Sequence, residues 1–128
     1  MIAIEDFLLA AEAALGIEAK LLTHVTKIPL AESALAAPFA GFGALDFYES
    51  PIERAAILAS RIMRNYPLPE GNERVALVLM DDYLDRHGLR LTATQIDRDR
   101  ILRAVASRQM SEDYFVIWVR SRTEPIEP

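Results

Sequence analysis

The chain contains no cysteine among its 128 residues, and this absence removes several kinds of chemistry at once. Without cysteine there is no disulfide, no thiolate nucleophile and no thiolate ligand for zinc. Histidine is scarce as well, and the spacing of His24 and His87 gives no support for a metal site built on histidine and carboxylate. No apolar run approaches the roughly 18 residues that a membrane span needs. We therefore expect neither a cysteine-dependent protein nor a membrane protein.

Positive charge is also in short supply. Fourteen Lys and Arg residues stand against nineteen Asp and Glu, which gives a net charge of −5 and argues against a nucleic-acid-binding module. Glu5 and Asp6 lie where a signal peptide has basic residues, so we expect a cytoplasmic protein. Apolar residues make up 52% of the chain, enough for one packed core. We expect a single domain over residues 1–122 and a flexible tail over 123–128.

Helical signals dominate this domain. Ser50 can cap a helix that begins at Pro51, with Glu53 completing a capping box. Val75–Met80 is apolar on every side of a helix, and such a helix is a buried one, so we expect it at the centre of the fold. The fold class is therefore all-α. The helices expected are Ile4–Leu15, Glu18–Lys27, Leu30–Ala37, Pro51–Asn65, Glu73–His87, Ile96–Arg108 and Ser111–Arg122.

Residues 38–50 break the helical pattern. Two glycines and several aromatic residues predict an irregular loop or a short hairpin there. The aromatic side chains can either clamp an extended segment of a target or partner, or fill the core beneath the loop. The sequence leaves these two alternatives open for Phe39, Phe42, Phe47 and Tyr48.

The segment from Asn65 to Arg74 is the one that carries a chemical signal. A glycine-containing turn that leads into a helix directs free backbone N–H groups at one point, where the helix dipole favours an anion such as phosphate. Arg74 can reach back to a phosphate, and Glu70 can bind Mg²⁺. Asn72 is the expected N-cap of the helix. Spacing alone leaves an ordinary interhelical turn as an equal alternative.

The same segment resembles a known motif. Tyr66-Pro-Leu-Pro-Glu-Gly-Asn-Glu-Arg-Val-Ala is similar to the Fic/Doc motif, His-Pro-Phe-x-Asp/Glu-Gly-Asn-Gly/Lys-Arg followed by small apolar residues. The resemblance extends over about residues 28–120, and the length is typical of the short Doc (death-on-curing) branch. It implies a compact helical bundle around a buried central helix. It also implies a target-binding flap over residues 39–49, which contain the four aromatic side chains.

The resemblance also implies an activity. In the family, the motif His is the general base, the acidic residue holds Mg²⁺, and the Gly-Asn turn and the Arg bind nucleotide phosphates. Fic proteins transfer AMP to a target protein, whereas Doc toxins phosphorylate a translation elongation factor and are neutralised by an antitoxin. ATP and Mg²⁺, an antitoxin-like partner and a translation-factor target are therefore implied here. By position, Glu70 would hold Mg²⁺, and Gly71, Asn72, Glu73 and Arg74 would lie at the phosphates.

Two residues depart from the motif. Tyr66 occupies the position of the catalytic His, and a phenol with a pKa near 10 cannot replace imidazole as a base at neutral pH. Losing a general base typically costs about 10²–10⁴ in rate. Glu73 occupies the Gly/Lys position and adds a carboxylate where an anionic nucleotide would lie. Both changes weaken the same chemistry.

The sequence therefore predicts a Doc-like toxin-family protein of a toxin–antitoxin type system, with a degenerate, inactive or weak transferase site, that acts through partner binding. The alternative is an active nucleotide-dependent transferase in which another group supplies the base, since phosphoryl transfer depends mostly on positioning. His24 is one candidate for that base. His87 is expected to bind terminal carbonyls of its helix. Asp81–Asp82 and Asp97–Arg100 are expected on solvated helix faces.

Overall fold

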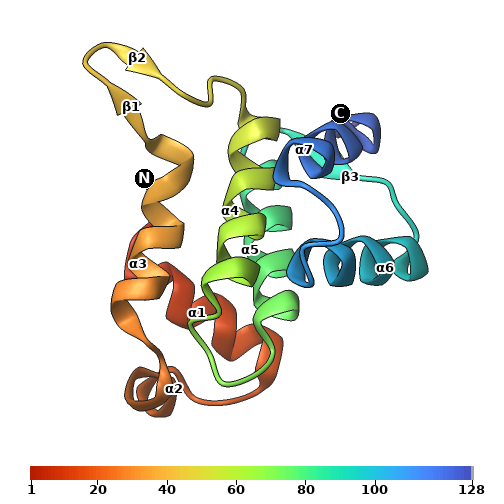
Figure 1. Ribbon diagram of the computed structural model, residues 1–128. Coiled ribbons are helices and arrows are strands. Elements are labelled where there is room, and N and C mark those ends of the chain that lie inside the picture. The colour runs from red at the N-terminus through yellow and green to blue at the C-terminus, as the bar shows by residue number, and fades with distance from the viewer. Residues whose placement is uncertain (128) are drawn as a thin grey trace.

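The computed structural model describes residues 1–127 and confirms the predicted, mostly helical fold class (Figure 1). Each expected helix is present, with ends that differ by a few residues. The helices are α1 Ile4–Leu15, α2 Ala19–Val25, α3 Ile28–Ala36, the short 3₁₀ helix η1 Ala37–Phe39, α4 Pro51–Asn65, α5 Asn72–Arg86, α6 Gln95–Ala106 and α7 Glu112–Ser121. The strands are β1 Gly41–Phe42, β2 Leu45–Asp46, β3 Leu89–Leu91 and β4 Thr123–Pro125.

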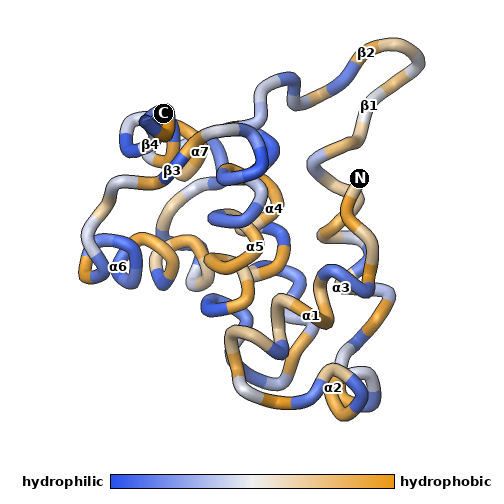
Figure 2. The backbone as a smooth tube through the Cα atoms, turned by 180° about the vertical axis from the view of Figure 1, so that it is seen from behind, coloured by the Kyte–Doolittle hydropathy of each residue, from blue (hydrophilic) through white to orange (hydrophobic). Residues whose placement is uncertain are grey.

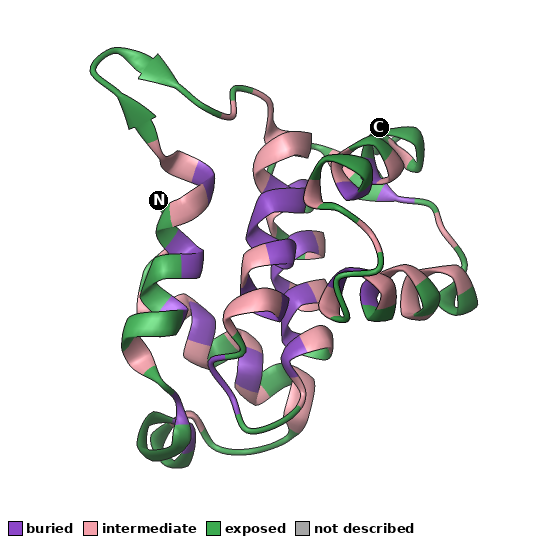
Figure 3. Ribbon diagram, viewed as in Figure 1, coloured by how far each residue is buried: buried purple, intermediate pink, exposed green. Residues whose placement is uncertain are grey.

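Helices α4 and α5 form the central pair of the bundle. Helix α3 covers α4 on one side and α7 covers it on the other, while α1 packs on α5 (Figure 1). The prediction that Val75–Met80 is buried all round is wrong in part, because Leu77 and Val78 are only partly buried. The most enclosed helix is α4, whose residues 55–60 are all buried (Figure 3). Helix α5 is less enclosed, since its Leu77 and Val78 line a shallow depression with residues of α1 and α6.

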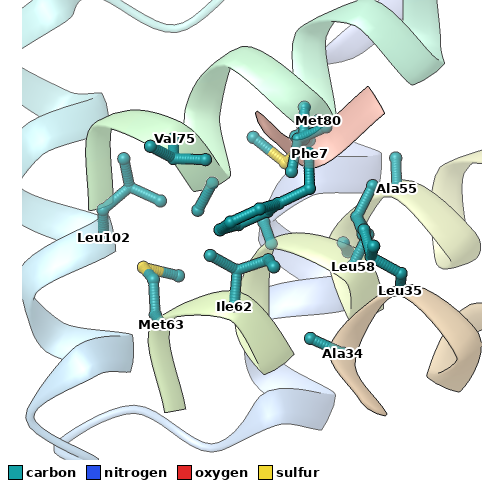
Figure 4. Close-up of a cluster of buried hydrophobic side chains, with 14 of the residues drawn as sticks. Phe7, Ala34, Leu35, Ala55, Leu58, Ile62, Met63, Val75, Met80 and Leu102 are labelled. Carbon is teal, nitrogen blue, oxygen red and sulfur yellow. The ribbon is translucent and has the colours of Figure 1, made fainter. Parts of the chain in front are cut away.

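The core is built around one aromatic ring. Phe7 of α1 is fully buried and lies in the middle of a cluster that includes Ile62 of α4 and Met80 of α5 (Figure 4). Phe115 and Val119 of α7 belong to the same cluster. Complete burial of such a side chain stabilises the folded state by about 1.5–3 kcal/mol. The core therefore ties the N-terminal helix and the last helix to the central pair.

The start of α4 follows its sequence signal, with one correction. The Ser50 Oγ atom accepts a hydrogen bond from the Glu53 N–H at 3.1 Å, as expected of an N-cap. The Glu53 carboxylate, however, forms an ion pair with Arg120 of α7, 3.5 Å away. The expected second half of the capping box is thus replaced by a contact between two helices.

The predicted flexible tail is wrong over most of its length. Strand β4 pairs antiparallel with β3, and the Ile126 N–H donates to the Gly88 carbonyl at 2.9 Å. The sequence gives little sign of this strand, because three residues are too few for an alternating pattern. The edge of β3 supplies backbone groups that need partners, and the tail satisfies them. Pro128, the last residue of the predicted tail, lies outside the described residues.

The segment before α4 forms a short hairpin, which settles the choice between a loop and a hairpin. Strands β1 and β2 pair antiparallel with Phe42 opposite Leu45, and the hairpin projects from the body of the molecule (Figure 1). Gly41 is required there, because a Cβ atom at this position would collide with the Leu45 carbonyl oxygen. Within residues 1–127, no helix has the length and apolar character needed to cross a membrane.

Candidate functional site

The motif loop, residues 66–71, connects the end of α4 to the start of α5. Tyr66 ends α4 in a left-handed conformation, with φ 54° and ψ 55°, and its N–H donates to the Ile62 carbonyl at 3.2 Å. Its side chain is 55% exposed. Few residues other than Gly or Asn adopt this conformation, so the turn holds Tyr66 at a fixed place at some cost in free energy. The loop therefore presents the phenol to solvent.

Asn72 does not cap α5, which corrects the prediction. Gly71 occupies the N-cap position, and no side chain accepts a hydrogen bond there. The Asn72 side chain is instead buried, 3% exposed, and spans the loop from inside. Its Oδ1 atom accepts from the Leu68 N–H at 3.0 Å and its Nδ2 atom donates to the Leu68 carbonyl at 2.9 Å. Asn72 thus fixes the shape of the loop rather than the end of the helix.

Gly71 is fixed by two constraints. Its φ of +85° is strained for any residue with a Cβ atom. A Cβ atom at this position would also lie 2.5 Å from a methyl carbon of Leu15, at the end of α1. The end of α1 therefore packs directly against the turn that leads into α5.

A second segment holds the loop from the other side, and sequence reasoning missed it. The junction between α2 and α3, Thr26 and Lys27, runs beside the loop, and the Lys27 N–H donates to the Pro67 carbonyl at 2.8 Å. The Asn65 Nδ2 atom donates to the Leu30 carbonyl at 3.1 Å. The first contact joins two backbone groups and the second joins a side chain to a carbonyl 35 residues away, so no residue type or spacing signals them.

The first turn of α5 keeps its backbone donors free. In the part of the chain that the structure describes, the N–H groups of Asn72, Glu73 and Arg74 donate to no backbone or side-chain acceptor. Together with the positive end of the helix dipole, these groups form the geometry that binds phosphate oxygens. The backbone of the loop therefore fits the predicted phosphate site.

Most charged side chains at the start of α5 are negative, opposite in sign to the positive end of the helix dipole. Glu73 and Arg74 line a depression of about 380 Å³, together with Asp99 and Gln95 of α6. Two carboxylates and one guanidinium group thus line the depression. The apolar residues that line the depression are Ala14, Leu77, Val78 and Leu102. The side chains of the depression do not fit a polyphosphate, although the backbone does.

Glu70 lies exposed on the loop, where it can reach a bound cation. Across residues 1–127, no three carboxylate or imidazole side chains come together in a group that could hold a metal ion. Magnesium commonly binds through one or two carboxylates plus phosphate oxygens. Glu70 is therefore suited to a metal that arrives with a nucleotide rather than to a resident ion.

The hairpin does not lie over the motif loop, so the flap expected at residues 39–49 is misplaced. Helix α4 has 15 residues, and at 1.5 Å per residue it separates the hairpin from the loop by about 22 Å (Figure 1). The segment that does contact the loop is the α2–α3 junction. The order along the chain places residues 39–49 before α4 and the motif loop after it, so the length of the predicted helix already implied this separation.

The four aromatic residues of this segment divide between the two alternatives. Phe39 packs at the hairpin base, with the Arg54 guanidinium 5.3 Å from its ring centre. The Tyr48 carbonyl accepts from the Arg54 Nε atom at 2.9 Å, so Tyr48 also belongs to the base. Phe42 and Phe47 are 82% and 57% exposed and remain free to contact a partner.

The structure supports the role expected for His87 but not the role considered for His24. The His87 Nδ1 atom lies 2.9 Å from the Tyr83 carbonyl, which confirms the expected role at the end of its helix. His24 falls on the side of α2 away from the buried Leu22 and Thr26, so its side chain is directed to solvent. His24 is therefore poorly placed to act as a replacement base at the loop.

Arg98 is not on a solvated face, contrary to the prediction, whereas the side chains of Asp81, Asp82, Asp97 and Arg100 are exposed as expected. The Arg98 guanidinium is 3.3 Å from the Asp81 carboxylate and also donates to the Leu91 and Ala93 carbonyls. Burial raises the pKa of Asp81 above its ordinary value, although Arg98 lowers it. Arg98 thus fastens the segment between β3 and α6 to α5.

A further ion pair, not foreseen from the sequence, joins α4 to α7. Glu112 accepts hydrogen bonds from the Arg61 Nε atom at 2.9 Å and from the Ser60 Oγ atom at 2.7 Å. Burial pushes the pKa of Glu112 upward, but the hydrogen bonds from Arg61 and Ser60 outweigh it and hold that pKa below its ordinary value. This pair lies one turn before the motif loop and stabilises that end of α4.

Comparison with known proteins covers the loop and the helices around it. The model of the Fic/DOC family matches residues 2–84, which include α1, the hairpin, α4, the motif loop and most of α5. The chain belongs to the Fic/Doc family. A relative of this family named Toxin Doc, from Mycolicibacterium smegmatis (strain ATCC 700084 / mc(2)155), is 32% identical over 111 residues. The alignment covers 85% of this chain and 82% of the relative. No solved structure matches the chain at a significant level.

Family membership confirms the recognition that the motif suggested. Within a Fic/Doc protein, the loop between the two central helices is the segment that the motif defines. The individual roles of Tyr66, Glu70, Gly71, Glu73 and Arg74 remain predictions, because the family model and the relative identify the chain as a whole rather than its residues.

Proposed function

We propose that this Fic/Doc protein belongs to a toxin–antitoxin type system, that its transferase site is degenerate, and that it acts by binding an antitoxin-like protein partner. Its likeness to a relative named Toxin Doc supports the toxin family. The observation that carries the degenerate site is that two carboxylates, Glu73 of α5 and Asp99 of α6, line the same depression as Arg74. A triphosphate would meet a net negative charge there.

The chain retains part of what a transferase needs. ATP with Mg²⁺ would supply the transferred group, and Glu70 would hold the metal. The free N–H groups at residues 72–74 would bind and orient phosphate oxygens. Tyr66 is where the family has its base, and a phenol at neutral pH keeps its proton rather than accepting another. Binding geometry is thus present without the group that would activate a target hydroxyl.

The retained backbone donors also favour a second candidate function. In this alternative the chain is an active phosphoryl- or AMP-transferase that modifies a hydroxyl of a target such as a translation factor, with a base other than Tyr66. Positioning and charge stabilisation supply most of phosphoryl-transfer catalysis, so activity can persist without the base. The two candidates differ in what Tyr66 and Glu73 contribute.

Growth of a bacterial host after induction separates these candidates. The variants are Tyr66→His, Glu73→Lys and the double variant, with Arg74→Ala added to the double variant as a control. We expect the wild-type chain to leave growth unchanged and the double variant to arrest it. We expect Tyr66→His alone to have little effect, because Glu73 still repels the nucleotide. The Arg74→Ala control should restore growth.

Growth arrest by the wild-type chain would contradict the degenerate site. If that arrest also survived Tyr66→Phe and ended with Arg74→Ala, the active transferase with another base would be the correct reading. Equal levels of folded protein, measured by circular dichroism and by yield, are required for each comparison.

A further inference from the structure

The outer side of helix α7 is uncovered and apolar at its centre. The inner side holds the buried Phe115 and Val119, whereas Tyr114 and Ile117 are 59% and 60% exposed on the opposite side (Figure 3). Residues three apart are neighbours on a helix surface, so these two side chains form one apolar patch. Figure 1 and Figure 2 both place α7 at the edge of the molecule, beside the C-terminus. The patch is therefore open to another molecule.

Opposite charges lie at the two ends of this outer side. Asp113 is exposed in the first turn of α7, and Arg120 follows two turns later on the same edge of the helix. The Arg120 guanidinium is 3.5 Å from the Glu53 carboxylate of α4, which holds it at the C-terminal end, yet 54% of its side chain stays exposed. The side thus runs from a negative to a positive end. The residues that we call the α7 face are Asp113, Tyr114, Ile117, Arg120 and Ser121.

Such a face is complementary to an antiparallel copy of itself. A two-fold axis next to Ile117 brings the two Ile117 side chains of a pair of copies together. The same rotation reverses the direction of the helix and keeps each edge beside its own counterpart. Asp113 of one copy then faces Arg120 of the other, and on the second edge Tyr114 faces Ser121. A parallel copy would instead place like charges together at both ends.

We infer that the α7 face binds a second copy of this chain in an antiparallel dimer with two-fold symmetry. Burial of Ile117 and Tyr114 supplies the attraction, and the two Asp113–Arg120 pairs fix the direction and register of the helices. From Asp113 to Ser121 the face is about 12 Å long at 1.5 Å per residue, so the dimer is a weak one. The inference goes beyond the proposed function, because it concerns a surface that takes no part in the motif loop.

Sedimentation equilibrium over about 20 μM to about 1 mM tests this inference, because a weak interface associates only at high concentration. We expect the apparent mass to rise from the 14.3 kDa of the monomer toward twice that value. Ile117→Asp should keep the chain monomeric over the whole range. Ile96→Asp is the matched control, since Ile96 is 70% exposed on α6 and lies outside the α7 face. It should associate like the wild-type chain.

Two charge reversals test the antiparallel arrangement. Asp113→Arg brings like charges together at both ends of the dimer, and so does Arg120→Asp, so each variant alone should associate about tenfold more weakly. A mixture of the two variants is complementary again, and we expect a heterodimer at concentrations where each alone is a monomer. A chain with both changes should regain most of the wild-type affinity. Circular dichroism checks that each variant is folded, since Arg120→Asp also loses the contact with Glu53.

Other results would overturn the inference. These are a wild-type chain that stays monomeric at every concentration, a dimer that Ile117→Asp leaves intact, or charge variants that do not associate when mixed. A dimer that persists in Ile117→Asp and is dissolved by Phe42→Ser would assign self-association to the hairpin instead. The growth assay with Tyr66 and Glu73 variants does not involve α7, so failure here leaves the degenerate site standing.

Discussion

The two ends of α4 differ in how they are held. At the C-terminal end, the motif loop has a buried centre, with Leu68 and Asn72 only 2% and 3% exposed, and it is bonded to the α2–α3 junction. At the N-terminal end, the hairpin has no buried residue over 41–46, and the exposed Asp46 carboxylate pairs with Arg54 at 3.3 Å. Helix α4 thus carries a fixed loop at one end and a projecting hairpin at the other.

In the motif loop, the residues that fix the shape are different from the residues that would carry the chemistry. The groups that set the shape are Gly71, Asn72 and Leu68, and all three are fixed by packing or hydrogen bonds. Tyr66 and Glu73, the residues that depart from the family motif, are not among the groups that hold the loop together. Substitutions at these two positions can therefore remove an activity while the fold persists.

Removing the Asn72 side chain should have the largest effect on stability. Asn72→Ala deletes two hydrogen bonds and leaves the buried Leu68 N–H and carbonyl without partners, which costs about 2–3 kcal/mol. Urea unfolding followed by circular dichroism measures the loss. The matched control is Asn65→Ala, whose more exposed bond to Leu30 should cost less than about 1 kcal/mol. Equal losses for the two variants would show that the loop is not held from inside.

Adding one methyl group at two glycines compares the loop with the hairpin directly. Gly71 and Gly43 both have positive φ, so Gly→Ala at either position costs about 1–2 kcal/mol in backbone strain. Only at Gly71 would the methyl group also collide with Leu15, since Gly43 has open space around it. The Leu15 side chain can shift in part, so we expect Gly71→Ala to cost less than about 1 kcal/mol more than Gly43→Ala in chemical denaturation. The same cost at both sites would mean that α1 does not press on the loop.

The ion pairs near the two ends of α4 should also differ in how much they stabilise the fold. The pair near the motif loop should contribute more, and its loss should cost less than the loss of the Asn72 side chain. Glu112→Gln weakens the pair with Arg61, 15% exposed on the Glu112 side, and should cost about 1–2 kcal/mol at pH 7. Asp46→Asn removes the exposed pair with Arg54 and should cost less than about 0.5 kcal/mol.

The pH dependence of the Glu112 effect follows from its lowered pKa. A carboxylate whose pKa is lower in the folded state stabilises the fold above its unfolded pKa, near 4.5. That contribution is lost as the pH falls through the lowered value. The difference in unfolding free energy between wild type and Glu112→Gln should thus be constant near neutrality and shrink below about pH 4.5. A difference that grew on acidification would contradict the assigned direction.

The sequence was informative where a signal is local. Helix ends at Gly16, Ser50 and Ser111 follow from residue type, since each cap depends on a few neighbouring residues. The motif itself, from Tyr66 to Arg74, also lies within one short stretch. Both kinds of signal can be recognised without any knowledge of the tertiary structure.

Most errors arose where distant segments meet. Asn72 is a local exception, since it has the residue type of an N-cap, yet its hydrogen bonds reach back four residues into the loop. The tail pairs with β3 across more than 30 residues, and the Lys27 contact with Pro67 uses backbone atoms alone. Such contacts depend on the packing of the whole chain.

Thermal melting with and without Mg²⁺-ATP tests the central claim most directly, that charge rather than backbone geometry keeps nucleotide out. The wild-type chain should melt within about 1 °C of its nucleotide-free value, whereas Glu73→Lys should gain several degrees at saturating nucleotide, because a ligand of the folded state stabilises it. Adding Arg74→Ala to Glu73→Lys should remove that gain. A shift of several degrees in the wild-type chain, lost on Arg74→Ala, would contradict the account and show that the site still holds nucleotide.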